Sequence, residues 1–250
     1  MSPSIDTSSP AIARFDPESL SQRFAAMAPS DIIRWAVDTF GDGLLMTSSF
    51  GAESMCLIHL LTRAKPNVRI VLVNTGYLFP QTLIFMEEMR RRYGLNVMEY
   101  HSQHDPLVYL TVHGETDPRM RRDVDACCRD NKNEVFDRAM RELAPAAWVR
   151  GVRADQSAIR SRMKVVQWNT RVNAWAISPL LNWDHRRIFD YMKHHNLPFH
   201  PLWPQGYVSI GCNPETCTSP VAADSDPRGG RWGGMDKKEC GIHLDQGAGI

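Results

Sequence analysis

Short apolar runs alternate with longer amphipathic segments along the first part of the chain. The apolar runs, which have the length of buried β-strands, lie at residues 44–46, 69–73 and 96–100. The amphipathic segments, which have apolar residues at helical spacing, lie at residues 30–40, 52–63 and 80–93. The first of these is expected to take Ser30 as its N-cap and to end before Gly41. Strands that alternate with helices are typical of a parallel sheet with right-handed crossovers, so the pattern predicts an α/β fold.

The alternation continues with shorter strands in the second half of the chain. Further helices are expected at residues 131–143 and 184–195, and further strands at residues 147–152 and 175–178. The later helix has two candidate N-caps, Asn182 and Asp184. Proline and glycine are frequent from Leu197 onward, and residues 204–234 are expected to be largely loop. We therefore expect a partly disordered leader over 1–28, an α/β domain over 29–205, and a cysteine-bearing loop with a mobile tail over 206–250.

Composition narrows the class of protein. The formal net charge is +1 at pH 7, so nothing favours nucleic acid or a membrane as a partner, and any anion site must be built locally. The apolar runs are too short to span a bilayer, and the Ser- and Pro-rich N-terminus lacks the pattern of a secretion signal. We therefore expect a cytoplasmic protein. In that compartment its six cysteines suit metal binding or catalysis better than a disulfide framework.

The segment Ser48-Ser49-Phe50-Gly51 follows a predicted strand and precedes a predicted helix. Small residues at such a junction expose backbone N–H groups, and a helix N-terminus favours an anion. Thr75 and Gly76 follow the next strand, and ligands of open parallel sheets bind at the carboxyl ends of the strands. The two loops therefore indicate a phosphate site, although an ordinary strand–turn–helix junction has the same pattern. The loop is not a Walker loop, because it lacks the Gly-Lys-Ser/Thr ending.

Four arginines follow the strand predicted at residues 147–152. They are Arg150, Arg153, Arg160 and Arg162. The guanidinium fork suits phosphate and sulfate oxygens, whereas a solvated basic face is the alternative interpretation. Their position after a strand's carboxyl end favours an anion site.

Four of the cysteines form two pairs, Cys127 with Cys128 and Cys212 with Cys217. Four thiolates hold either a tetrahedral zinc ion or a [4Fe–4S] cluster. Adjacent cysteines suit zinc poorly, because both side chains must bend toward one small ion. Two unrelated pairs of thiols are the remaining alternative. Cys56 lies in the apolar pattern of residues 52–63 and is expected in the core.

Cys240 stands apart from the other cysteines, in a segment that contains Lys237, Lys238 and His243. Nearby positive charge lowers the pKa of a thiol and so supplies the nucleophilic thiolate. Glycines at 241, 247 and 249 predict a mobile tail, on which a thiolate carries a covalent adduct from one site to another. Exposed cysteines without a use are avoided, so we interpret Cys240 as a catalytic nucleophile.

Motifs along nearly the whole ordered chain, from about Trp35 to His243, resemble one enzyme family. They are Ser48-Ser49-Phe50-Gly51, Thr75-Gly76-Tyr77-Leu78-Phe79-Pro80, Gly151-Val152-Arg153 with Gln156 and Arg160, Pro201-Leu202-Trp203 with Gly206-Tyr207, and Glu239-Cys240-Gly241-Ile242-His243. The chain resembles the assimilatory sulfonucleotide reductases, which reduce adenylylsulfate (APS) or phosphoadenylylsulfate (PAPS). The resemblance implies an adenine-nucleotide α-hydrolase-like, Rossmann-type fold, in which the first motif is a pyrophosphatase loop that no longer cleaves ATP.

The resemblance also implies a mechanism. Cys240 would attack the sulfuryl sulfur and expel AMP, which leaves an enzyme S-sulfonate. Thioredoxin, or glutaredoxin in its place, would then attack the Cys240 sulfur and release sulfite. The residues that the resemblance implies as substrate contacts are Ser48, Ser49, Phe50, Gly51, Thr75, Gly76, Lys132, Arg153, Arg160, Arg228, Arg231 and His243. A homo-oligomer is compatible with the resemblance.

The cysteine pairs discriminate within the family. Bacterial APS reductases carry a Cys-Cys pair and a second pair that bind a [4Fe–4S] cluster, whereas the PAPS-specific branch lacks both, so Cys127, Cys128, Cys212 and Cys217 favour APS. The second pair departs from the family, because two residues are inserted between its cysteines. Ser219 replaces an arginine, and Asn74 replaces an aspartate. Three alternatives stay open: a PAPS reductase without a cluster, an ATP-using enzyme of the same fold, and a nucleotide-binding redox sensor.

Overall fold

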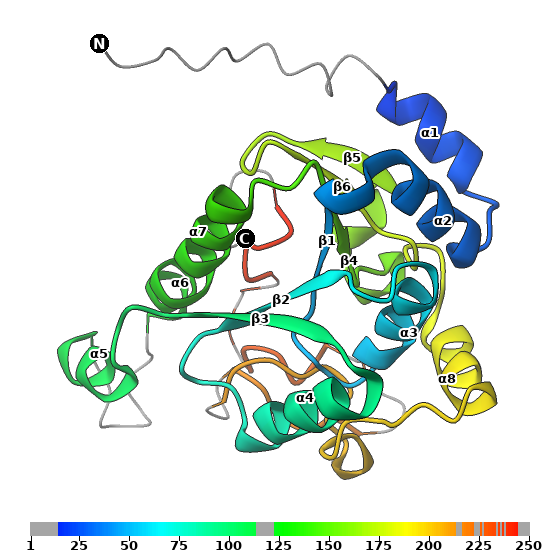
Figure 1. The fold of residues 1–250 in the computed structure, drawn as a ribbon. Helices are drawn as coiled ribbons and strands as arrows, with labels where there is room; N and C mark the ends of the chain where they lie inside the picture. Colours follow the sequence, from blue (N-terminus) through cyan, green and yellow to red (C-terminus); the bar gives the residue numbers. More distant parts are fainter. Residues whose placement is uncertain are drawn as a thin grey trace, which may run out of the picture.

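A mostly parallel sheet forms the centre of the molecule (Figure 1). Its strands are β1 (Leu44–Thr47), β2 (Arg69–Asn74), β3 (Asn96–His101), β4 (Ala147–Arg150), β5 (Val166–Asn169) and β6 (Ala174–Ile177). Their order is β3-β2-β1-β4-β6-β5, and β5 alone among them runs antiparallel to its neighbour. This computed structural model describes residues 15–113, 123–213, 217–222, 226, 228–233, 235, 237 and 239–244.

The central strands bury side chains on both faces of the sheet. In β1, Leu44 and Met46 belong to one core cluster and Leu45 to the other, and in β4 the same split separates Val149 from Trp148. Alternate side chains point to opposite faces of a strand, so continuous apolar runs need covering layers on both sides. This explains why β1, β2 and β4 lie inside the sheet, whereas β3, whose residues are half-buried or exposed, lies at its edge.

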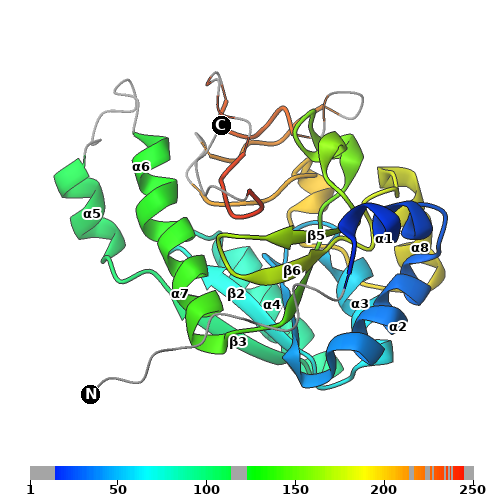
Figure 2. The ribbon, with the colours of Figure 1, turned by 90° about the horizontal axis from the view of Figure 1, so that it is seen from above.

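Helices cover both faces of the sheet. They are α1 (Pro17–Phe24), α2 (Pro29–Phe40), α3 (Ser54–Ala64), α4 (Pro80–Tyr93), α5 (Pro106–His113), α6 (Val124–Cys128), α7 (Glu134–Leu143) and α8 (His185–His194), with a π-helical turn at Arg129–Asn133 between α6 and α7. Buried residues of α2, α3, α4 and α8 pack with the cluster that contains Leu44, and those of α7 pack with the cluster that contains Leu45. Figure 2 shows α6 and α7 on one side of the sheet and α1, α2, α3 and α8 on the other.

Several helix boundaries differ from those expected from sequence. Helix α2 begins at Pro29 with Ala28 as its N-cap, so the prediction of Ser30 as a side-chain cap is wrong. The fixed φ of proline suits the first helical position, and its missing N–H is one that the start of a helix leaves unpaired in any case. For α8 the choice between two caps is resolved, because the Asp184 carboxylate accepts a hydrogen bond from the Arg187 backbone N–H at 2.8 Å.

Four of these elements, α1, α5, α6 and β5, were not predicted. Strand β5 pairs along the edge of the sheet with β6, so the predicted parallel sheet carries one antiparallel edge strand. Helix α1 lies within the segment expected to be a leader, and its Leu20 and Phe24 are buried in the core. Residues 1–14 of that segment lie outside the described residues.

The C-terminal segment is irregular, as expected, but it is packed against the domain. Its described residues form isolated pairings, Leu78 with Cys212 and Thr218 with Arg231, rather than strands. Cys240 and Ile242 are 8% exposed and belong to the core cluster on the α7 side of the sheet. In both ribbon views the red end of the chain lies beside α6 and α7 (Figures 1 and 2). The predicted mobility of the tail stays a prediction, and Gly247 and Gly249 fall outside the described residues.

The chain order of the strands creates a switch point in the sheet. The chain adds β2 and β3 on one side of β1 and then places β4 on the other side. Ligands of open α/β sheets bind beyond the carboxyl ends of the strands at such a point. The loops after Thr47 and Arg150 meet there. Among the described residues, no helix is long and apolar enough to cross a bilayer.

Replacing Leu61 by Ala tests the buried helix layer. Leu61 is 0% exposed in α3, whereas Leu107 in α5 is 76% exposed. We expect Leu61→Ala to lower the free energy of unfolding by about 2–5 kcal/mol, because it leaves a cavity. Leu107→Ala, the control with the same chemistry, should change it by less than about 0.5 kcal/mol. Urea denaturation followed by circular dichroism measures both, and equal losses would contradict the assignment of α3 to the core.

Candidate functional site

A cavity opens at the switch point, beyond the carboxyl ends of β1, β2 and β4. Most of the side chains predicted to contact a substrate line it, together with the predicted nucleophile. These are Ser48, Ser49, Gly51, Thr75, Lys132, Arg153, Arg160, Arg228, Arg231, His243 and Cys240. Phe50 and Gly76, also predicted as contacts, do not line it. The structure therefore brings together residues that lie up to 195 positions apart, from Ser48 to His243.

Phe50 shapes the loop after β1 rather than facing the cavity. Its side chain is 0% exposed, and its φ is +49°, a left-handed conformation that a bulky residue rarely adopts. The Phe50 backbone N–H donates to Ser48 Oγ at 3.1 Å, and Ser54 Oγ donates to the Gly51 carbonyl at 2.9 Å. Burial of the phenyl ring holds the backbone in this turn, which leaves Ser48, Ser49 and Gly51 on the cavity wall.

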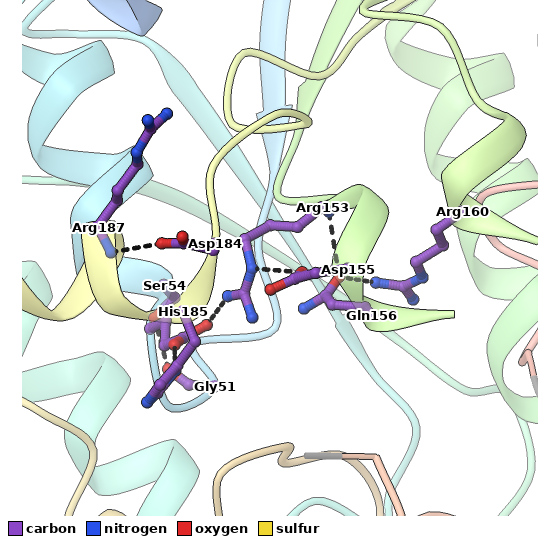
Figure 3. Close-up of polar contacts among 10 residues, drawn as sticks. Gly51, Ser54, Arg153, Asp155, Gln156, Arg160, Asp184, His185 and Arg187 are labelled. Atoms are coloured by element: carbon purple, nitrogen blue, oxygen red, sulfur yellow. Dashed lines mark hydrogen bonds and ion pairs between the residues drawn. The ribbon is translucent and has the colours of Figure 1, made fainter. Parts of the chain in front are cut away.

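Arg153 lies in the cavity wall but is already paired with acidic groups. Its Nη1 forms an ion pair with Glu53, and its Nε donates to Asp155 Oδ1 at 2.9 Å (Figure 3). Glu53 also pairs with His185, and this hydrogen bond raises the pKa of His185. Glu53 and His185 were not among the site residues predicted from the sequence. Glu53 lies two residues after the predicted anion loop and is the N-cap of α3, and this position could have indicated it as a site residue. No sequence pattern indicates His185.

Arg160 and Arg150 connect the domain to the C-terminal segment. The Arg160 Nε and Nη2 donate to the two carboxylate oxygens of Glu239 at 2.7 and 2.9 Å. Arg150, which is 0% exposed, donates to Ser178 Oγ and to the His243 carbonyl, each at 2.9 Å. Arg162, the fourth arginine of the predicted group, is exposed and does not line the cavity. The four arginines predicted to form one anion site therefore have different roles. Arg153 and Arg160 pair with carboxylates, Arg150 binds Ser178 and the C-terminal segment, and Arg162 is exposed.

The electrostatic surroundings of Cys240 favour its thiolate. Burial raises the pKa of the thiol, but the positive charge of Lys132 and the Ile242 backbone N–H outweigh burial and bring the pKa to about 7. In turn, burial lowers the pKa of Lys132, but the negative charges of Cys240 and Cys212 raise it above its ordinary value. Lys132 therefore stays protonated beside a thiol that ionises near neutral pH. A buried thiolate of this kind is a nucleophile.

His243 is uncharged in this setting. Burial, followed by the charges of Arg160 and Arg150, lowers its pKa well below the usual range of histidine. Its ring stacks on Trp148 with the centroids 6.1 Å apart, and its buried Nδ1 has no hydrogen-bond partner among the described residues. Within the described part of the chain, the neutral His243 ring therefore has one unpaired nitrogen, Nδ1, in the same segment as Cys240.

All four paired cysteines line a second, smaller cavity, which adjoins the first. Cys127, Cys128, Cys212 and Cys217 lie on its walls, and Thr75, Lys132, Arg231 and Trp232 line both cavities. Cysteine thiolates are the ligands of iron–sulfur clusters, so this donor set fits a cluster in number and chemistry. Within the described part of the chain, no three histidine, cysteine or carboxylate side chains converge on a single metal ion.

Backbone contacts hold the second cysteine pair in place. Cys212 pairs with Leu78, and its Sγ lies 3.3 Å from Thr75 Oγ1. On the other side, Thr218 pairs with Arg231, whose Nη1 donates to Thr218 Oγ1 at 3.0 Å. Of the four residues between these cysteines, 214–216 lie outside the described residues. Cys212 and Cys217 both line the second cavity despite the insertion between them.

The pH dependence of Cys240 alkylation tests this electrostatic account. The thiolate is the reactive form, so the rate should rise with pH through a midpoint near 7, which is the pKa given above. Lys132→Ala removes the stabilising charge, so the midpoint should move up toward the ordinary thiol value of about 8.5. Mass spectrometry of the Cys240 peptide separates it from the other cysteines. Lys193→Ala, an exposed lysine of α8, is the control, and the account is wrong if both variants give the same midpoint.

Known proteins match this chain over the region that forms most of the cavity. The sequence model of the phosphoadenosine phosphosulfate reductase domain matches residues 43–220. A "Phosphoadenosine 5'-phosphosulfate reductase" of Gloeobacter violaceus is 38% identical over 232 residues, which cover 90% of this chain and 92% of that protein. A protein of the same name from Xylella fastidiosa is 37% identical, with 91% of this chain and 94% of that protein covered.

Solved structures agree with the fold. The phosphoadenylyl-sulfate (PAPS) reductase of Candida auris, in a phosphate complex, is 25% identical and gives a TM-score of 0.66, with 78% of this chain and 93% of that chain covered. The FMN adenylyltransferase of Candida glabrata, in complex with ATP, is 19% identical with a TM-score of 0.57, over 85% of this chain and 69% of that one. The second likeness concerns the fold alone and agrees with the predicted adenine-nucleotide α-hydrolase-like architecture. The chain belongs to the phosphoadenosine phosphosulfate reductase family, the sulfonucleotide reductases.

Proposed function

We propose that this sulfonucleotide reductase converts APS to sulfite and AMP, with thioredoxin as the electron donor. The observation that carries the proposal is the position of Cys240, whose thiol lines the main cavity beside Lys132 and has a pKa of about 7. A nucleophile that ionises at working pH and faces a cationic cavity suits attack on an anionic sulfur ester.

In the first half-reaction the Cys240 thiolate attacks the sulfur of the substrate's sulfate group. A sulfur–sulfur bond forms, the bond from sulfur to the bridging oxygen breaks, and AMP leaves with the electron pair. The product on the enzyme is a Cys240 S-sulfonate. Lys132 and Arg231 line the cavity around Cys240, and their positive charges stabilise the negative charge that develops on the departing phosphate.

In the second half-reaction a thiolate of reduced thioredoxin attacks the Cys240 sulfur. The bond between the two sulfurs of the S-sulfonate breaks, and sulfite leaves with the electron pair. The mixed disulfide is then resolved by the second thiol of thioredoxin, which ends the cycle oxidised and returns Cys240 as a thiolate. The two electrons that reduce the sulfur therefore come from the dithiol of thioredoxin. Because Cys240 is 8% exposed, this half-reaction requires the C-terminal segment to leave the cavity.

The four clustered cysteines favour APS over PAPS. Their location on one cavity wall supports a [4Fe–4S] cluster held by Cys127, Cys128, Cys212 and Cys217. A bound cluster would contribute to the electrostatic field at the sulfate end of the substrate, and Lys132, which lines both cavities, would carry that influence to Cys240. The alternative is a PAPS reductase that releases adenosine 3′,5′-bisphosphate, which the names of the curated relatives favour.

Incubation with each nucleotide in the absence of thioredoxin tests the reaction and the substrate. We expect the intact mass of the protein to increase by one SO₃ group, with APS reacting faster than PAPS, and the adduct to map to Cys240. Reduced thioredoxin should then release one sulfite per adduct. Cys240→Ser is the control and should form none. A faster reaction with PAPS would support the alternative, and no adduct with either nucleotide would overturn the proposed function.

Iron and acid-labile sulfide analysis tests the cluster without reference to activity. Protein purified without oxygen should contain about four irons and four sulfides per chain. Cys217→Ser should lose most of both, because it removes one of four ligands. Cys56→Ser is the matched control, since Cys56 is 0% exposed in the core on the other face of the sheet. Wild-type protein without iron, or Cys217→Ser with a full complement, would argue against the cluster.

A further inference from the structure

Arg160 and Glu239 form a buried ion pair that joins the domain to the residue preceding Cys240. Arg160 is 6% exposed and Glu239 is 2% exposed. The guanidinium donates through Nε to one carboxylate oxygen at 2.7 Å and through Nη2 to the other at 2.9 Å. This is the bidentate arrangement, which fixes the relative orientation of the two groups as well as their distance.

The rest of the pair's polar atoms are satisfied within the protein. Ser157 Oγ donates to Glu239 Oε1 at 3.0 Å, and Arg228 Nη2 lies 3.5 Å from Glu239 Oε2. The remaining nitrogen of Arg160, Nη1, donates to Gln156 Oε1. Burial raises the pKa of Glu239, but the hydrogen bonds from Arg160 outweigh it and lower the pKa. All three guanidinium nitrogens of Arg160 therefore have an acceptor in the protein itself.

Two other cations of the main cavity differ from Arg160. Lys132 and Arg231 line the cavity, and neither has a carboxylate partner within the described part of the chain. The buried Nε of Arg231 has no hydrogen-bond partner there at all. A buried donor without an acceptor is costly, and an anionic ligand supplies acceptors. Of the cations that line the main cavity, Lys132 and Arg231 are thus the two without a carboxylate partner among the described residues.

We propose that Arg160 is a positioning residue that acts through Glu239. The pair fixes the segment before Cys240 so that the thiol lies in the cavity, while the anionic groups of the nucleotide bind at Lys132 and Arg231. The inference rests on the proposed function for the identity of the nucleotide. It replaces the expectation, drawn from the resemblance, that Arg160 contacts the substrate.

Arg160→Gln, Glu239→Gln and the double variant test the pair. At a pH well above the alkylation midpoint measured for each variant, so that the thiol is ionised, each single variant should raise the rate of Cys240 alkylation about tenfold and slow S-sulfonate formation by a similar factor. The double variant should resemble the singles, because two residues that act as one unit are not additive. Glu239→Asp, which keeps the charge, should recover part of both rates.

Nucleotide affinity separates positioning from binding. Measured by calorimetry in the Cys240→Ser background, where no adduct forms, the Kd for APS should change by less than about twofold in Arg160→Gln. Arg162→Gln is the matched control, since Arg162 belongs to the same short helix but is exposed, and it should behave like the wild type throughout. Circular dichroism confirms that each variant is folded.

Two results would overturn the inference. One is an affinity for APS that falls about tenfold in Arg160→Gln but not in Glu239→Gln, which would make Arg160 a substrate ligand. The other is a double variant whose rates change by the product of the single effects. Wild-type protein that forms no adduct from either nucleotide would instead refute the proposed function. The alkylation rates need no nucleotide and would still decide whether Arg160 and Glu239 act as a pair.

Discussion

Buried positive charge at the carboxyl edge of the sheet needs negative charge close by. Arg150, Arg160, Arg228 and Arg231 all lie near Lys132 in or beside one cavity, and burial together with neighbouring Arg160 lowers the pKa of Arg228 to about 10. Cations gathered in a region with little water are destabilising unless anions accompany them. The protein supplies two of these anions from the last residues that the structure describes, Glu239 and the thiolate of Cys240.

This requirement explains why an irregular segment docks against a regular fold. The described residues after 205 form few backbone pairings with the domain, and proline and glycine give them little intrinsic order. Trp232, Cys240 and Ile242 pack in the core cluster on the α7 side of the sheet. Specific polar contacts add to this packing: Glu239 on Arg160, the His243 carbonyl on Arg150, and the Gly241 carbonyl on Arg171. A segment held by side-chain packing and a few polar contacts is released more easily than one held by a sheet ladder. Such an attachment is compatible with a nucleophile that must meet two different reaction partners.

The sequence predicted the parts of the fold that local pattern determines. The bounds of strand β2 and helix α4 were predicted almost to the residue. Strand β2 is a short apolar run, and α4 is an amphipathic segment bounded by Pro80 and Gly94. Edge strand β5 was missed, since its residues acquire their pairing only from β6. For the site, the rule that ligands bind beyond strand ends located the loops correctly. The ion pair between Arg160 and Glu239 spans 79 positions, and no local pattern indicates which arginine faces a substrate and which faces a carboxylate.

Gly211 shows how one small residue limits what variation the site tolerates. A Cβ atom at this position would lie 1.9 Å from Nη1 of Arg231, so the guanidinium occupies the space that any side chain would need. A change to alanine adds a single methyl group and removes no functional group, yet it would force the Arg231 guanidinium to shift from the position in which it lines both cavities. In a comparison of natural variants, this position would therefore behave as though it were a ligand. Conservation of this glycine would reflect the space that the Arg231 guanidinium occupies, and not a chemical role of the glycine itself.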